Sequence, residues 1–333
     1  MFKTQPLKFK MLAVAGLVAG AFVTQAAHAN LVRADGSSTV FPITEAVAEE
    51  FQKSTRGKTR VTVGISGTGG GFRRFCRGET DVQNASRPIL AGEIQNCRAA
   101  GVQFIELPVA FDAVTVVAHR DNPLNSISVE DLKKMWEPAA QGRIMRWNQV
   151  NSAFPDQPLA LFGPGADSGT FDYFTEAING RSKASRGDFT ATEDDNVIVT
   201  GVSRNRNSLG YLGFAYFLEN QDKIKGLAIS SKGGAPVAPT AANVLNGTYQ
   251  ALSRPIFIYV NARSLARPEV REFVNFYMRN AAKLVSEVKY VPLPAAAYEY
   301  NLSAIQRGRV GTKMGGVNRV GLTIDELMKL EAK

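Results

Sequence analysis

The sequence predicts an α/β protein whose sheets are largely parallel. A short apolar strand, a loop rich in Gly, Ser and Thr, and a helix follow one another in that order three times. Such alternation is typical of parallel sheets with helices packed on their faces. The chain is 44% hydrophobic and 21% charged, as folded proteins are, and its 333 residues suffice for two domains of roughly 150 residues each.

The first unit begins with a short extended segment at residues 31–34, followed by the hydroxyl-rich loop 36–39. Apolar residues then recur at i, i+4 and i+8, which places them on one buried helix face: Ile43, Val47 and Phe51. Ser38 or Thr39 is the expected N-cap of this helix, and Pro42 suits its first turn.

The second and third units repeat this pattern. In the second, a strand at residues 61–65 leads into the loop 66–71, and the helix is expected to start with Phe72 and Phe75. In the third, a strand at residues 159–162 leads into the loop 163–169, and the following helical face carries Phe171, Phe174 and Ile178.

Two β-rich stretches are interpreted as crossings between lobes, Ile105 to Ala118 and Pro255 to Val260. A helix is expected from Arg267 to Glu287, and a terminal helix opens at Thr323, whereas residues 233–242 have the Gly, Pro and Ala content of a surface loop.

Residues 1–29 are a predicted secretory signal peptide. Lysines near the start precede an uncharged apolar run from Met11 to Val23, and Ala27-His28-Ala29 has the pattern of a cleavage site. The run is shorter than the ~20 residues that cross a bilayer, so a membrane anchor is not expected. No cysteine lies near Asn30, so no lipid anchor is expected either. Removal of three lysines lowers the formal net charge from +9 to about +6.

Export places Cys76 and Cys97 in an oxidising compartment. With only two cysteines in the chain, a disulfide between them is the favoured interpretation, and two buried free thiols are the alternative. A bridge across this separation would stabilise the fold by about 3 kcal/mol.

The chemistry concentrates at the loop-to-helix junctions. A helix N-terminus presents unpaired backbone N–H groups and the positive end of the helix dipole. Glycines allow close approach of a ligand, and Ser or Thr hydroxyls add donors, so such junctions can bind an anion without a lysine. Helix capping alone explains any single junction, but three of them favour a shared anion site at one crevice.

Other chemistries lack the residues they need. The chain has no GxxxxGK[ST] loop, the glycines at 67–71 do not fit a dinucleotide fingerprint, and residues 165–169 are out of register with GxSxG. The mature chain keeps a single histidine, His119, which is interpreted as structural. Catalysis, a metal and a cofactor are therefore not expected. Nucleic-acid binding is not expected, because the tightest basic cluster is explained by a solvated helix face: Arg73, Arg74 and Arg77.

Four short motifs occur in the order of a known family: Gly36 to Pro42, Ser66 to Gly70, Asn84 to Ile89, and Asp167 to Thr170. The match continues through residues 129–147, 209–211 and 253–260. The chain resembles the periplasmic phosphate-binding proteins of ABC transporters, the PstS family, and especially its SphX-like branch.

The resemblance implies a type II periplasmic binding protein with two α/β lobes, a two-crossing hinge and a ligand in the cleft between the lobes. Lobe 1 would comprise residues 30–110 and 255–333, and lobe 2 residues 111–254. The protein would be a periplasmic monomer that captures inorganic phosphate and delivers it to the membrane permease of an ABC importer.

The resemblance also implies which residues bind phosphate. Lobe 1 would contribute Ser38, Thr39, the N–H of Val40, Gly67, Thr68 and Ser86. Lobe 2 would contribute Ser168, Gly169 and Thr170.

The chain departs from the family pattern at two places. Arg87 stands where many members have an aspartate that accepts the phosphate proton, and Pro164-Gly165 stands where many have an arginine. We therefore expect Arg87 to make a bidentate contact with the anion and Asp167 to accept its proton. In the alternative, Arg87 pairs with an acid such as Asp81, and Asp167 only caps its helix.

Two other functions stay open at this point. One is a receptor for another tetrahedral oxyanion, such as sulfate or molybdate, and the other is a phosphate-sensing or adhesive protein on the same fold.

Overall fold

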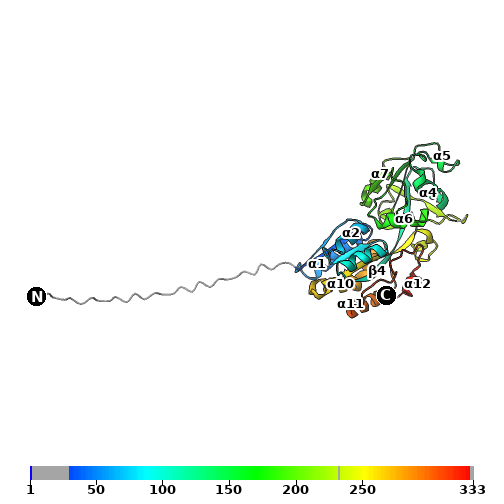
Figure 1. The fold of residues 1–333 in the computed structure, drawn as a ribbon. Coiled ribbons are helices and arrows are strands. Elements are labelled where there is room, and N and C mark those ends of the chain that lie inside the picture. Colours follow the sequence, from blue (N-terminus) through cyan, green and yellow to red (C-terminus); the bar gives the residue numbers. More distant parts are fainter. Residues whose placement is uncertain (2–29, 232, 331–333) are drawn as a thin grey trace.

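The computed structural model describes residue 1, residues 30–231 and residues 233–330, which form two α/β lobes side by side (Figure 1). The predicted signal peptide, apart from Met1, lies outside the described residues. A curled ten-stranded sheet runs through both lobes in the order β2-β1-β3-β11-β4-β8-β6-β7, with β12 and β9 also paired to β4.

Lobe 1 is built from three strand–helix pairs at the start of the described chain, β1-α1, β2-α2 and β3-α3, and from two helices near the C-terminus. Its strands β1, β2 and β3 are parallel to one another. The elements are β1 (Asn30–Gly36), α1 (Phe41–Ser54), β2 (Thr59–Val63), α2 (Thr68–Phe75), β3 (Val82–Ala85), α3 (Ala91–Ala99), α10 (Pro268–Glu287), β12 (Val291–Pro292) and α11 (Ala295–Arg307).

Lobe 2 contains the middle of the chain. Its strands β6, β7 and β8 are also parallel. The elements are β5 (Ser126–Ser128), α4 (Val129–Trp136), α5 (Trp147–Val150), β6 (Ala160–Pro164), α6 (Gly169–Asn179), β7 (Thr190–Thr192), α7 (Asp195–Ser203), β8 (Ser208–Gly213), α8 (Phe214–Glu219), β9 (Ile224–Gly226), β10 (Ala228–Ser230) and α9 (Ala241–Leu245).

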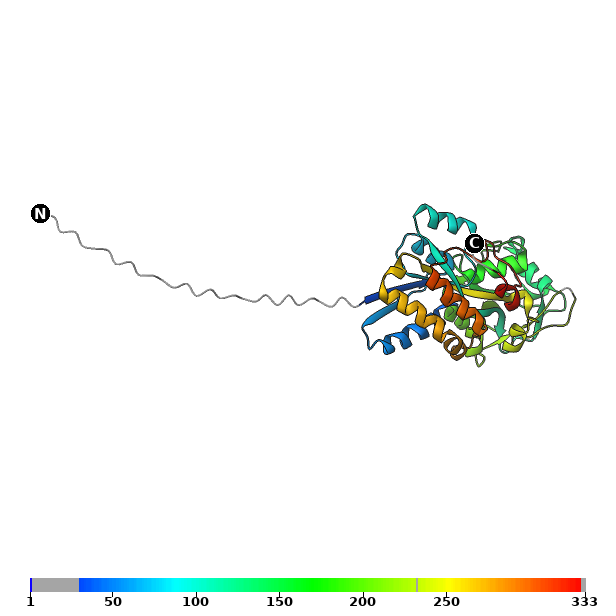
Figure 2. The same ribbon diagram turned by 90° about the horizontal axis from the view of Figure 1, so that it is seen from below.

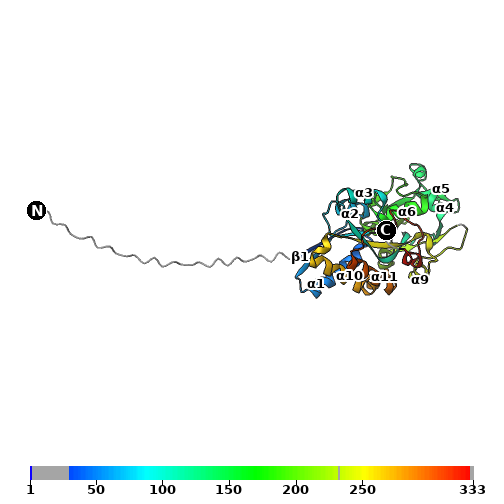
Figure 3. The ribbon, with the colours of Figure 1, turned by 60° about the horizontal axis from the view of Figure 1, so that its bottom comes forward.

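Two long strands join the lobes, β4 (Phe104–His119) and β11 (Ser253–Asn261). They run antiparallel along most of β11, and β4 continues into lobe 2, where it pairs with β8. All of β4 except His119 is buried, because helices cover both faces of the sheet. Figure 3 shows α2, α3 and α6 on one side and α1, α10 and α11 on the other, and Figure 2 shows α10 and α11 packed side by side. The strands expected at both crossings are confirmed, and the sheet is mixed because these two strands are antiparallel to their neighbours.

Two expected helix starts are wrong. Helix α1 begins at Phe41 with Val40 as its N-cap, and no side chain caps it, so neither Ser38 nor Thr39 has the capping role. Helix α2 begins at Thr68, which places Gly69, Gly70 and Gly71 inside the helix. A glycine is needed inside the helix at position 71, because a Cβ atom there would lie 2.1 Å from Gln83 Oε1.

The segment that follows α11 crosses both lobes before it reaches α12 (Ile324–Met328). On lobe 1, Gly316 O accepts a hydrogen bond from the N–H of Ala91 at 3.1 Å. On lobe 2, Asn318 Nδ2 donates to Glu176 Oε2 at 2.7 Å, and the N–H of Gly321 donates to the Tyr173 hydroxyl at 3.0 Å.

The predicted disulfide between Cys76 and Cys97 is present and connects the end of α2 to α3. Both half-cystines are buried. The bridge therefore fixes α3 to the helix that begins at Thr68.

We expect reduction of this bridge to lower the free energy of unfolding by about 3 kcal/mol, because the open form regains the entropy of a short closed loop. Urea unfolding with and without a reductant measures the difference. The double variant Cys76→Ala/Cys97→Ala is the control and should not respond to the reductant. Equal stability of the oxidised and reduced wild type would contradict this expectation.

Candidate functional site

Hydroxyl groups of the two lobes meet in the interior of the molecule. Thr39 Oγ1 of lobe 1 lies 3.1 Å from Thr170 Oγ1 of lobe 2, and both residues are completely buried. Within lobe 1, Thr68 Oγ1 lies 3.2 Å from Ser86 Oγ and accepts a hydrogen bond from the Ser86 N–H. A Cβ atom at Gly169 would lie within 2.6 Å of both of these oxygens, so the start of α6 adjoins them. We call Thr39, Thr68, Ser86 and Thr170 the hydroxyl cluster.

Three helices begin beside this cluster. Helix α1 starts just after Thr39, α2 starts at Thr68, and α6 starts at Gly169 with Ser168 as its N-cap. The Ser168 hydroxyl accepts a hydrogen bond from the N–H of Thr170. The positive ends of three helix dipoles thus face one buried region, which is the arrangement that favours a bound anion.

Gly67 allows the backbones of the two lobes to approach each other. Its φ of 72° is rarely adopted by other residues, and a Cβ atom there would lie 2.6 Å from Asp167 O. The N–H of Gly69 donates to the same carbonyl at 2.8 Å. The lobes are therefore closed on each other at the start of α2.

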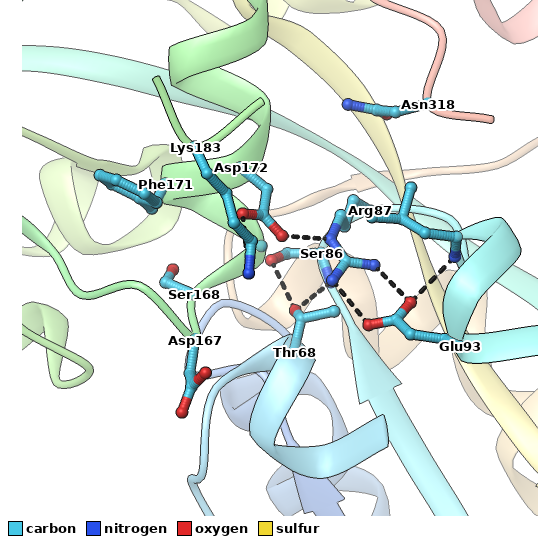
Figure 4. Close-up of polar contacts among 12 residues, drawn as sticks. Thr68, Ser86, Arg87, Glu93, Asp167, Ser168, Phe171, Asp172, Lys183 and Asn318 are labelled. Atoms are coloured by element: carbon cyan, nitrogen blue, oxygen red, sulfur yellow. Dashed lines mark hydrogen bonds and ion pairs between the residues drawn. The ribbon is translucent and has the colours of Figure 1, made fainter. Parts of the chain in front are cut away.

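The guanidinium of Arg87 is bonded to two carboxylates of the protein (Figure 4). Its Nε donates to Asp172 Oδ2 at 2.6 Å, while Nη1 and Nη2 each donate to the Glu93 carboxylate at 2.8 Å. Nη1 also donates to Pro88 O, and the side chain is only 1% exposed. Since a bidentate contact needs two free N–H groups on one side of the guanidinium, the expected contact with the anion stays a prediction, and in this closed arrangement it would require Asp172 or Glu93 to release Arg87.

The alternative interpretation paired Arg87 with Asp81, and this partner is wrong. The Asp81 carboxylate pairs with Arg267 at 2.8 Å. Arg87 instead pairs with Asp172 across the two lobes, which makes it the buried link between α6 and the start of α3.

Asp167 does not have the surroundings of a buried proton acceptor. Its carboxylate is 37% exposed and accepts two hydrogen bonds from the Arg73 guanidinium, at 2.6 and 3.0 Å. These bonds lower the pKa of Asp167. In Figure 4 the carboxylate points away from Thr68 and Ser86. Asp167 is not the helix cap either, because Ser168 is.

The arginine cluster on α2 is more than a solvated helix face. Arg73 reaches across to Asp167 of lobe 2, and Arg74 pairs with the buried Asp35. Arg77 pairs with Glu79, two positions further along the same lobe.

Gly165 stands at the position of the missing family arginine, next to Glu193. A Cβ atom there would lie 2.3 Å from Glu193 Oε1, so a larger residue would require the Glu193 side chain to move.

Arg254 lies directly behind the hydroxyl cluster and was not predicted. Its Nη2 donates to Thr170 Oγ1 at 2.8 Å and approaches Thr39 Oγ1 at 3.5 Å, and its Nη1 donates to Gly169 O at 3.1 Å. The guanidinium is 1% exposed and pairs with Asp112 at 3.1 Å. A signal was present in the sequence, since Ser-Arg-Pro-Ile at 86–89 recurs at 253–256, and both arginines prove to be buried in ion pairs.

Asp195 is the second residue that sequence reasoning missed. It begins α7, is 1% exposed, and receives a hydrogen bond from the N–H of Gly213, but its Oδ2 has no hydrogen-bond partner among the described residues. A Cβ atom on Gly213 would lie 3.6 Å from this oxygen and 3.7 Å from Thr39 Oγ1, so both atoms border the same spot. Burial, and next the Asp112 charge, raise the pKa of Asp195 to about 7. A signal was present in the sequence, since Asp194-Asp195 stands at a junction between a strand and a helix. The junction was passed over because it has no glycine.

Two kinds of feature are absent from the described part of the chain. Within residues 30–231 and 233–330, no three His, Cys, Asp or Glu side chains are grouped so that they could hold a metal ion. Among the same residues, no helix has both the length and the apolar character needed to span a bilayer.

Comparisons with known proteins agree with the fold. The family model of the PBP superfamily domain matches residues 23–281. The curated protein SphX of Synechococcus elongatus is 51% identical over 96% of this chain and 95% of its own length. The phosphate-binding protein PstS of Staphylococcus haemolyticus is 35% identical over 83% of this chain and 85% of its own. The chain therefore belongs to the PBP superfamily and, within it, to the family of SphX and PstS.

Solved structures give the same picture. A crystal structure of a possible phosphate binding protein from Planctomyces limnophilus matches with a TM-score of 0.62 and 44% identity, over 84% of this chain and 99% of that one. A putative phosphate ABC transporter substrate-binding protein from Clostridium perfringens matches with a TM-score of 0.67 over 80% of this chain and 100% of that one. At 24% identity, the second match shows the shared fold alone.

The geometry predicts unequal contributions from two of the ion pairs that join the lobes, Arg87–Asp172 and Arg73–Asp167. Arg87→Gln leaves Asp172 and Glu93 without their buried cation, so we expect a loss of about 3–5 kcal/mol in the free energy of unfolding. Arg73→Gln removes an exposed pair and should cost about 1 kcal/mol or less. Urea unfolding of the ligand-free variants measures both values. The expectation is wrong if the two substitutions are equally costly.

Proposed function

We propose that this protein captures inorganic phosphate between its two lobes and delivers it to the permease of an ABC-type importer. One observation carries the proposal: hydroxyl groups from both lobes converge on the starts of three helices, with Thr39 and Thr170 only 3.1 Å apart. The names of the relatives support it, since PstS of Staphylococcus haemolyticus is a phosphate-binding protein.

The proposed ligands are neutral groups. Lobe 1 supplies Ser38, Thr39, the N–H of Val40, Gly67, Thr68 and Ser86, and lobe 2 supplies Ser168, Gly169 and Thr170. In place of Arg87, Arg254 provides the positive charge nearest to the hydroxyl cluster. Hydrogen bonds to a charged oxygen are about twice as strong as neutral ones, so this set can hold an anion firmly when water is excluded.

Closure of the lobes would complete the site. Arg87–Asp172, Arg73–Asp167 and the bond from the Gly69 N–H to Asp167 O all join the lobes. An anion that bridges the two halves of the hydroxyl cluster adds to these contacts and favours the closed form. Closing a cleft around a ligand is a common hinge motion, and the closed shape is what a permease could recognise.

We propose that lobe 1 comprises residues 30–110 and 255–333 and lobe 2 residues 111–254, with β4 and β11 as the hinge. Residues 331–333 lie outside the described part. The segment near Asn318 belongs to lobe 1 by its position in the chain, but it contacts Glu176 of lobe 2. We propose that the protein acts as a periplasmic monomer without a membrane anchor and without enzymatic activity. The disulfide is consistent with export.

Titration calorimetry tests the proposal. After removal of any co-purified ligand, we expect one phosphate per chain, with sulfate and molybdate bound more weakly. Thr170→Val should weaken phosphate binding by about tenfold or more, because a hydrogen bond to a charged group contributes about 1.5–3 kcal/mol.

Thr115→Val is the matched control. Thr115 is equally buried, its hydroxyl has no hydrogen-bond partner within the part of the chain that the structure describes, and it lies on β4. This variant should bind phosphate like the wild type. If the stripped wild type gives no heat with phosphate, the proposed function is overturned, and preferred binding of sulfate or molybdate would assign the site to another oxyanion.

A further inference from the structure

Opening of the two lobes must break the buried ion pair between Arg87 and Asp172, and the two partners differ in what remains to them. Arg87 keeps its bidentate contact with Glu93 of the same lobe, at 2.8 Å from each of Nη1 and Nη2. Asp172 Oδ2 loses the bond of 2.6 Å from Arg87 Nε, and its Oδ1 has no hydrogen-bond partner among the described residues. The open form therefore leaves the charge of Asp172 without its bonded cation.

The surroundings of Asp172 make such a charge costly. The side chain is 1% exposed in the closed structure, and this burial raises the pKa of its carboxyl. The positive charges of Arg87 and, next, Lys183 oppose the rise in the pKa. A carboxylate that is kept from water needs a cation beside it. Of these two cations, Lys183 is the one that stays in the same lobe as Asp172 when the lobes part.

Lys183 is placed to take over as the partner of Asp172. Its Nζ lies 3.8 Å from Asp172 Oδ1, which is close enough for an ion pair but too far for a hydrogen bond. In Figure 4 the Asp172 carboxylate lies between Lys183 and Arg87. Lys183 Nζ donates to Ala166 O at 3.2 Å, and half of the lysine side chain is exposed. A small rotation of this long side chain brings its ammonium group onto Oδ1.

The backbone at Lys183 has an unusual conformation. Its φ of 66° lies in the left-handed region, which residues other than glycine rarely adopt. The other two such residues among those described follow the C-caps of α1 and α10, where this conformation is common, but Lys183 does not end a helix. The N–H of Lys183 donates to the buried Thr175 Oγ1 at 2.8 Å, which ties the loop back onto α6. Since Asp172 belongs to the same helix, this strained loop fixes the lysine beside it.

We propose that Asp172 exchanges its counter-ion when the lobes open, from Arg87 of lobe 1 to Lys183 of lobe 2. Lys183 then stabilises the open form more than the closed form, in which Arg87 already balances Asp172. The lysine is a positioning residue that makes the closed protein easier to open. The inference goes beyond the proposed function, because it concerns the motion of the lobes and holds for any anion bound between them. Only its test by ligand affinity rests on the proposed function.

The proposal predicts the sign of the effect of Lys183→Gln. Glutamine keeps an N–H donor for Ala166 O but offers no charge to Asp172, so the open form loses stability relative to the closed form. The equilibrium should shift toward closure by about two- to fivefold, as for the loss of one partly exposed ion pair. Because the anion is held by the closed form, phosphate affinity should rise by the same factor. A lysine that contacted or attracted phosphate would have the opposite effect, since its loss weakens binding.

Amide exchange in the ligand-free protein measures the opening itself. The N–H of Gly69 donates to Asp167 O across the lobes and is freed when they part. Its exchange, followed by NMR, should be about two- to fivefold slower in Lys183→Gln than in the wild type. The N–H of Gly71 donates to Gly67 O within lobe 1, so its exchange should be unchanged and serves as the internal control. Titration calorimetry gives the phosphate affinity of the same proteins.

Two further variants separate counter-ion exchange from the mere loss of a positive charge. Lys283→Gln removes the same charge from an exposed pair inside α10, where Nζ lies 3.7 Å from Glu287, and it should behave as the wild type does. Asp172→Asn removes the carboxylate that needs a counter-ion. When Lys183→Gln is added to Asp172→Asn, it should neither slow the exchange of Gly69 nor raise the affinity for phosphate.

The outcomes separate the two proposals. If the wild type binds no phosphate, the proposed function fails, and the exchange of Gly69 still decides the inference. If Lys183→Gln changes neither exchange nor affinity, water alone serves Asp172 in the open form and the inference is overturned. Weaker phosphate binding by Lys183→Gln also overturns it and would assign the lysine to the ligand. So does an equal effect of Lys183→Gln with and without Asp172→Asn, because the carboxylate would then have no part in it.

Discussion

The ion pair between Arg87 and Asp172 is the interaction on which the closed structure depends. Both side chains are buried, they belong to different lobes, and their bond is 2.6 Å long. A charge removed from water must be paired, so neither residue can lose the other without a large cost. Glu93 binds the other edge of the same guanidinium at the start of α3, and the disulfide ties α3 to α2. The position of the hydroxyl cluster follows from this chain of contacts.

Because Arg87 and Arg254, the buried arginines beside the site, are both bonded to protein groups, anion recognition is left to neutral groups. Arg87 is occupied by two carboxylates, and Arg254 is divided between Asp112 and the side chain of Thr170. Hydroxyls and backbone N–H groups at helix starts are held in place by the fold and need little rearrangement to receive a ligand. The positive net charge of the chain has no direct part in this arrangement.

Local patterns in the sequence predicted the three strand–loop–helix units and the loops beside which the hydroxyl groups converge, whereas Ser86 and Thr170 were named through the family resemblance. The periodicity of Ile43, Val47 and Phe51 predicts α1, but the cap of α6 is Ser168 and not the suggested Asp167. The start of α2 was misjudged because glycine disfavours helices, whereas here the Gln83 side chain and the Gly36 backbone leave no room for a Cβ atom at position 71.

The partners of charged residues could not be read from the sequence. Arg73 and Asp167 are separated by 94 positions, and Arg87 and Asp172 by 85. A pairing over such distances depends on how the lobes close, which no local pattern encodes. The same limit hid Arg254 and Asp195, whose importance comes from their burial beside Thr39 and Thr170.

The segment after α11 is a third connection between the lobes, in addition to strands β4 and β11. Gly316 is bonded to lobe 1 and Asn318 to lobe 2, so only one residue, Val317, lies between the two attachments. An extended chain spans about 3.5 Å per residue, so this tether cannot follow the lobes apart by more than a few ångströms. Any wider opening must peel the segment from one lobe. The C-terminal part of the chain therefore holds the two lobes together, and its release from one lobe is a separate step in opening the cleft.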